Sequence, residues 1–241
     1  MPALLDVDHP TGWLPPHAMF AAPQPQATPA PAAPPRLLWL VDARAAPWAQ
    51  LIGEAAPPGQ GCSAVVALAC EGERGRSRRE HLQTLTRAYD ALADGSGAPV
   101  WLIASGYGAY LGTLLSQRRT IERMLLCAPA VYADAGWDLP WMVLDAAHAA
   151  HPSQAERAAN DNMAFVAAGQ YLGQVSVLVS PLADDDPPQA EDRHGLQVDY
   201  FYAFDRARER HLELPQRAAA SAAEALRQQV ARWLWARPAQ A

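Results

Sequence analysis

Apolar runs of five to seven residues recur along the chain after residue 35, and stretches with helical spacing separate them. Short runs of this kind, with β-branched residues and few charges, are typical of strands that are buried on both faces of a sheet. They predict strands at 37–42, 64–70, 100–104, 124–128, 175–180 and 198–204.

The stretches between these runs have the spacing of amphipathic helices. In 80–93, for example, Leu82, Leu85, Tyr89 and Leu92 lie on one helical face. Further helices are predicted at 109–119, 153–169 and 218–235. Strands that alternate with helices predict an α/β fold, with a mostly parallel sheet and helices on both of its faces. Ligand sites of such sheets lie at the carboxyl ends of the strands.

The length of 241 residues suits one domain with a full core. Residues 22–35 are rich in Pro and Ala and are predicted to be a linker without packed structure. The sequence therefore divides into an N-terminal extension at 1–21, the linker, and an α/β domain at 36–236.

Residues 104–108, "ASGYG", join a predicted strand to a predicted helix, as the nucleophile elbow G-x-S-x-G does. The elbow needs small residues two positions before and two positions after its centre. Centred on Gly106, these positions hold Ala104 and Gly108, which fit; centred on Ser105, they hold Ile103 and a tyrosine, which would collide with the turn. We favour Gly106 as the elbow residue, with Ser105 beside the site, and keep Ser105 as the alternative centre.

Glycine at the centre of an elbow has a conformational reason. The elbow residue is held in a strained backbone conformation that costs roughly 1–3 kcal/mol for a residue with a Cβ. Glycine adopts positive φ readily. We therefore expect the fold to tolerate Gly106 although the hydroxyl is absent.

Several local strings resemble the α/β-hydrolase superfamily, most closely its bacterial dienelactone-hydrolase-like and serine-aminopeptidase-like members. "EGERGRS" (71–77) resembles a strand-end turn of these enzymes, and 105–132 resembles their elbow, the helix after it and the next strand. "LVSPLADDDPP" (178–188) is similar to the loop that delivers the acid, and "RERHLELP" (208–215) to the loop that delivers the histidine. The resemblance covers residues 36–236.

The resemblance implies a catalytic chain order of nucleophile, acid and histidine. Carried over, the nucleophile position is Gly106, the acid is Asp184, and the histidine is His211. Asp185 and Asp186 are alternatives for the acid. Without a hydroxyl at the nucleophile position no acyl-enzyme can form.

Other parts of the expected site are also incomplete. The loop at 41–48 lacks the His-Gly string that commonly supplies an oxyanion donor, which leaves the backbone N–H of Tyr107 as one donor. Residues 132–142 fall where the fold inserts a small cap, so Trp137 and Trp141 are candidates either for lining a pocket or for packing in the core or the cap.

Three functions are compatible with these residues. The first is a catalytically degenerate hydrolase-like protein that binds a small-molecule ligand or a protein. The second is a hydrolase of small esters or amides that uses a water activated by His211 and Asp184. The third is proton abstraction by the same dyad. No cofactor and no metal are implied.

The amino-acid composition limits the classes of binding partner that we expect. The net charge is −6, and the 19 basic residues are all arginine, so nothing favours nucleic-acid or membrane binding. The N-terminal residues do not resemble a signal peptide and no apolar run reaches 18 residues, so we expect a cytoplasmic protein. Cys62, Cys70 and Cys127 are expected to be small buried residues in a reducing compartment.

The remaining histidines, including His81, lack a motif and are expected at the surface or in loops. The last helix carries Trp233 and Trp235, which would suit a face for a protein partner.

Overall fold

The computed structural model describes residues 34–42, 63–68, 75–93, 95, 97–132, 134, 136–144, 162–179, 187–213 and 222–235. All of these residues lie in the unit Ala33–Ala241. The predicted extension at 1–21 lies outside the described residues, and so does the predicted linker 22–35 except for its last two residues.

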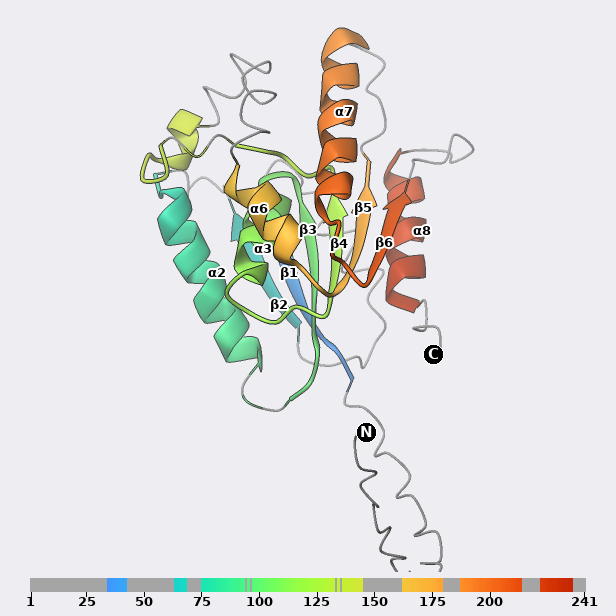
Figure 1. Ribbon diagram of the computed structural model, residues 1–241. Coiled ribbons are helices and arrows are strands. Elements are labelled where there is room, and N and C mark those ends of the chain that lie inside the picture. The colour runs from blue at the N-terminus through green and yellow to red at the C-terminus, as the bar shows by residue number, and fades with distance from the viewer. Residues whose placement is uncertain are drawn as a thin grey trace, which may run out of the picture. The chain divides into compact units, whose positions relative to one another are not determined.

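The described strands form one parallel sheet of six, in the order β2-β1-β3-β4-β5-β6 (Figure 1). The strands are β1 (Arg36–Asp42), β2 (Ser63–Leu68), β3 (Val100–Ser105), β4 (Arg123–Cys127), β5 (Gln174–Leu178) and β6 (Glu209–Glu213).

Helices cover both faces of this sheet, as the sequence predicts. Strand side chains alternate between two cores: Leu38 and Leu40 face one, and Leu37 and Trp39 face the other. Among the described helices, four cover the first core and α8 covers the second (Figure 1). These helices are α2 (Arg78–Ala93), α3 (Gly106–Ser116), α6 (Met163–Gln170), α7 (Pro187–Ala203) and α8 (Ala222–Trp235).

Two elements differ from the sequence prediction. Residues 198–204, predicted as a strand, form the end of α7 and the residue after it. Their alternating aromatic residues suggest a strand, but Gln197, Tyr200 and Phe204 are buried at helical spacing. The sixth strand is instead β6, "ERHLE", whose charged residues hid it because it lies at the sheet edge and is largely exposed.

The strand order marks one end of the sheet as the place for a ligand. β1 has β2 on one side and β3 on the other, so the order reverses there. Open α/β sheets bind ligands outside the carboxyl ends of the strands at such a reversal. The carboxyl end of β3 is Ser105, and Gly106 follows it. None of the described helices is long and apolar enough to cross a membrane.

Candidate functional site

The turn from β3 to α3 has the backbone of an elbow centred on Gly106. Gly106 has φ +50°, whereas Ser105 is extended with φ −128° and ψ 148°. The left-handed region is costly for residues with a Cβ and open to glycine. The strained position is therefore Gly106, in agreement with the register that the small neighbours favour.

Close packing explains why Gly108 is small. A Cβ built on Gly108 would lie 2.9 Å from the carbonyl oxygen of Leu40 and 3.0 Å from its Cβ. Ala104 is buried and pairs in register with the same Leu40. The first turn of α3 therefore rests directly on the backbone of β1.

The segment that follows β4 runs next to the elbow. The backbone N–H of Ala130 donates to the carbonyl oxygen of Gly106 at 3.2 Å. Ala128, two residues earlier, has φ +45°, and its N–H donates to the carbonyl oxygen of Leu178. A left-handed residue thus follows each of two neighbouring strands, β3 and β4, and the one after β4 is not glycine. Backbone strain of this kind concentrates at functional sites.

Four aromatic side chains pack together beside the elbow, and we call them the aromatic cluster: Tyr107, Tyr110, Tyr132 and Trp141. Tyr107 stacks on Trp141 with ring centroids 3.8 Å apart, and Tyr132 meets both rings edge-on. Tyr107 is completely buried. Its side chain therefore belongs to the core, while its backbone forms the first turn of α3.

Two polar residues of α2 are buried against this cluster, and the sequence analysis missed both. His81, expected at the surface, is fully buried, and its Nδ1 lies 2.9 Å from the hydroxyl of Tyr107. Arg78 is also fully buried and donates to the hydroxyl of Tyr110 at 2.9 Å. Their spacing to the apolar residue Leu85 on the same helix was the available signal.

Burial changes the pKa of one tyrosine in this cluster. It raises the pKa of Tyr110 to about 12, although the nearby Arg78 guanidinium opposes the rise. Arg78 also lies 5.1 Å from the ring centre of Trp137. Trp137, a candidate pocket residue, is therefore a cation–π partner of Arg78 and packs against the core.

Residues 136–142 of the expected cap are bonded to the start of α2 and to the residues just before it. The backbone N–H of Trp141 donates to the carbonyl oxygen of Arg76 at 2.7 Å, and Arg79 forms an ion pair with Asp138 at 2.5 Å. Trp141 is buried, so its role is core packing, the second of the two readings of this residue.

His211 stands in the middle of β6 and not in a loop, which corrects the sequence expectation. It pairs in register with Ser176 of β5, and both line a cavity beneath α8. Followed across the sheet in register, Ser105 of β3 is level with Glu213 of β6. His211 therefore lies two residues before the level of the elbow. Three strand spacings of about 4.8 Å also separate β6 from β3.

The elbow and the predicted histidine are therefore not brought together. Ser105, Gly106 and Tyr107 form one turn, whereas Trp137 contacts Arg78, whose guanidinium donates to Tyr110 of α3. Asp184, Asp185 and Asp186 lie outside the described residues. The connection from β6 to α8, residues 214–221, reads "LPQRAAAS" and contains no histidine.

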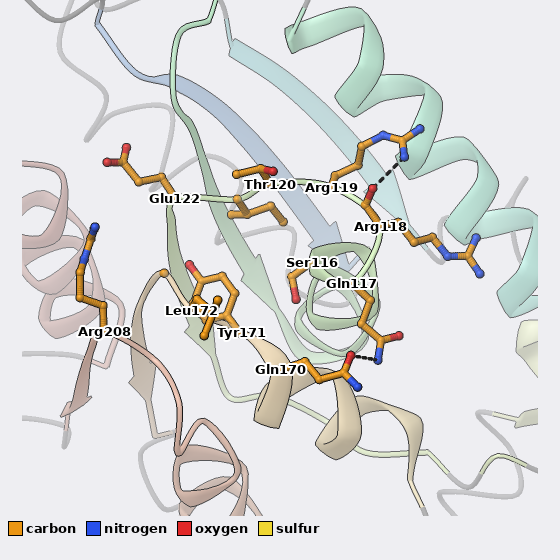
Figure 2. A pocket seen from close by; sticks show the side chains of 12 residues that line it. Ser116, Gln117, Arg118, Arg119, Thr120, Glu122, Gln170, Tyr171, Leu172 and Arg208 are labelled. Atoms are coloured by element: carbon orange, nitrogen blue, oxygen red, sulfur yellow. Dashed lines mark hydrogen bonds between the residues drawn. The ribbon is translucent and has the colours of Figure 1, made fainter.

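A cavity of about 490 Å³ lies at the opposite, amino edge of the sheet, and no sequence pattern predicted it. We call it the amino-edge cavity (Figure 2). Arg118 and Arg208 lie well apart on its two sides, and Gln117 donates to Gln170 at 3.3 Å. Its lining consists of Ser116, Gln117, Arg118, Arg119, Thr120, Ile121, Glu122, Gln170, Tyr171, Leu172, Gly173 and Arg208.

No protein-family model matches the sequence, and no curated protein matches it. Solved structures are similar in fold. A protein assigned to the alpha/beta hydrolase superfamily from Xanthomonas campestris gives a TM-score of 0.51 at 14% identity, over 84% of this chain and 98% of that chain. A monoacylglycerol lipase from Paleococcus ferrophilus gives a TM-score of 0.46 at 14% identity, over 82% of this chain and 93% of that chain. A peroxisomal alpha-beta-hydrolase from Saccharomyces cerevisiae gives a TM-score of 0.48 at 11% identity, over 87% of this chain and 80% of that chain.

Proposed function

We propose that this chain, which has the α/β-hydrolase fold, is a catalytically degenerate member of that architecture and acts as a ligand- or protein-binding module. The observation that carries the proposal is the elbow: its strained position, φ +50°, is occupied by Gly106, which has no side chain to attack a carbonyl. The fold hosts many functions, so the site has to decide among them.

The position of His211 supports the same proposal. A serine mechanism needs the base within hydrogen-bond reach of the nucleophile. His211 lies on β6 beneath α8, three strands from the elbow, and its side chain is 60% exposed. The connection that follows β6 offers no second histidine. Activation of a water at Gly106 by His211 and Asp184 would need His211 on a different part of the sheet.

The binding part of the proposal rests on the place of the elbow. It lies where the strand order reverses, which is the ligand site of open α/β sheets. Tyr107 and Trp141 are buried beside it, so their stacked rings support the turn from within the core and are not themselves a binding surface. The ligand or partner would instead meet the carboxyl ends of the strands beside Gly106.

The test is ester hydrolysis. The natural protein, His211→Ala, Gly106→Ser and Gly195→Ala are assayed with p-nitrophenyl acetate and butyrate at equal concentration. Gly195 is a matched control, because it lies in α7 and a Cβ there meets no atom within 4 Å. We expect the natural protein to release p-nitrophenol no faster than Gly195→Ala or buffer.

The two substitutions separate the alternatives. Turnover by the natural protein that disappears in His211→Ala and persists in Gly195→Ala would overturn the proposal in favour of a serine-independent hydrolase. Turnover gained only in Gly106→Ser would support degeneracy, because a hydroxyl at the elbow would then be the missing group.

A further inference from the structure

A second cavity, which we call the α8 cavity, lies between α8 and the face of β4, β5 and β6 that this helix covers. Its volume is about 190 Å³. It is separate from the elbow, because Ser105, Gly106 and Tyr107 do not line it and because α3 and α8 pack on opposite faces of the sheet. The residues that line it are Arg123, Leu125, Ser176, Leu178, His211, Glu213, Gln229, Arg232 and Trp233.

One guanidinium in this cavity is held in place by two indole rings. Arg123 lies 4.6 Å from the ring centre of Trp233 and 5.1 Å from that of Trp101. The two rings themselves meet edge-on. Trp233 is thereby buried against the sheet, so it does not form the free partner face that the sequence suggested. A guanidinium fixed in this way loses little conformational freedom when it binds an anion.

Further hydrogen-bond donors surround the same space from three other elements. Ser176 of β5 and His211 of β6 are adjacent register partners on one face of the sheet. Arg232 projects from α8, and within the described residues its one hydrogen bond is from Nε to the carbonyl oxygen of Gln228, at 3.4 Å. The planar fork of an arginine matches the oxygens of a carboxylate, sulfate or phosphate group.

Carboxylates also lie in and near the cavity, and some of them are engaged. Glu122 accepts a hydrogen bond from Nε1 of Trp101 at 3.1 Å, and its charge favours the protonated form of Arg123. Glu213 is the carboxylate of the lining, beside two guanidinium groups. Glu209 lies outside the lining, with its carboxylate 3.9 Å from Nε2 of His211, and its charge acts favourably on Arg123. Burial lowers the pKa of Arg123. A bound anion would offset this desolvation of the cation.

We propose that the α8 cavity binds a small oxyanion, the carboxylate, sulfate or phosphate group of a small molecule, through Arg232, Arg123, Ser176 and His211. The amino-edge cavity is larger, but its cations do not converge, because Arg118 and Arg208 lie on opposite sides of it (Figure 2). Arg119 is engaged with Asp90. The α8 cavity joins donors from four elements in a smaller space.

The experiment follows the imidazole resonances of the full chain by NMR during titration with sodium sulfate. The chain has seven histidines, and the signal of His211 is assigned by its loss in His211→Gln. Sodium chloride at matched ionic strength is the salt control, and sodium acetate is the carboxylate arm. Arg232→Gln removes a cavity guanidinium, and Arg118→Gln is the matched control outside the cavity.

We expect saturable movement of the His211 signal with sulfate, and a dissociation constant about tenfold higher in Arg232→Gln, the loss typical of a charge-assisted hydrogen bond. Arg118→Gln should behave as the natural protein does. Saturation by acetate but not by sulfate would assign the anion as a carboxylate. Equal movement with chloride, or an unchanged constant in Arg232→Gln, would overturn the proposal. Arg232→Lys, which keeps the charge and loses the fork, replaces Arg232→Gln should that variant not fold.

Discussion

Gly108→Ala tests whether the first turn of α3 is seated on β1 as closely as the structure has it. The added methyl group would lie 2.9 Å from the carbonyl oxygen of Leu40 and 3.0 Å from its Cβ. These atoms belong to a strand held between two neighbours, β2 and β3, so they cannot move aside alone. The elbow itself, two residues earlier, would shift with the helix.

Two effects of opposite sign set the size of the change. Alanine gains about 1 kcal/mol over glycine inside a helix. Overpacking of a close contact costs typically about 1–3 kcal/mol, and a rigid backbone partner places Gly108 at the upper end. The net prediction is a loss of about 2 kcal/mol in the free energy of unfolding, or a fall of about 4–8 °C in Tm for a chain of this size.

Gly195→Ala is the matched control for this measurement. Gly195 is also helical, in α7, but a Cβ there meets nothing within 4 Å. It should therefore keep the full helical gain of up to about 1 kcal/mol. Urea unfolding of both variants is followed by circular dichroism at fixed pH. If Gly108→Ala proved as stable as Gly195→Ala, the close seating of α3 on β1 would be wrong.

Three further predictions concern the same region. Gly106→Ala should cost about 1–2 kcal/mol in urea unfolding because φ is +50°, while Ser105→Ala, at an extended residue, should cost clearly less; equal losses would contradict the elbow register. Tyr107→Phe should destabilise the chain by about 1–3 kcal/mol, because it removes the partner of the buried His81 Nδ1, and thermal unfolding without a change would refute that contact. Burial raises the pKa of Tyr110 from its ordinary value of 10.0 to about 12, so its contribution to stability is complete below pH 10 and is lost as the pH rises toward 12. Tyr110→Phe should therefore weaken the loss of stability at alkaline pH, which is measured by unfolding at several pH values and by tyrosinate absorbance. An unchanged dependence of stability on pH in Tyr110→Phe would contradict this prediction.

The elbow shows what a short stretch of sequence can determine. Ala104, Gly106 and Gly108 predicted both the turn and its centre, because the required conformation and close approach depend on the presence or absence of a Cβ at each position. The order of strands and helices was legible for a similar reason. A strand that is buried on two faces is a continuous apolar run, and a helix that is buried on one face has apolar residues at helical spacing, so both patterns can be recognised in the sequence.

The sequence pattern did not predict that His211 lies in a strand. "ERHLE" is charged because β6 is an exposed edge strand, so it reads as a loop until its pairing with β5 is known. The last part of α7 carries alternating aromatic residues and reads as a strand, until packing buries Tyr200 and Phe204 at helical spacing. In both cases the neighbours, and not the local pattern, decide the conformation.

Tertiary structure alone brought Arg78 and His81 into the core. Each is a polar residue on the face of α2 that also carries Leu85, and this spacing alone does not supply the hydrogen-bond partners that burial requires. Their partners Tyr107 and Tyr110 come from α3, and Trp141 comes from the segment after β4. A buried polar group is stable only where its hydrogen-bond partners are brought to it, and those partners lie in other parts of the chain.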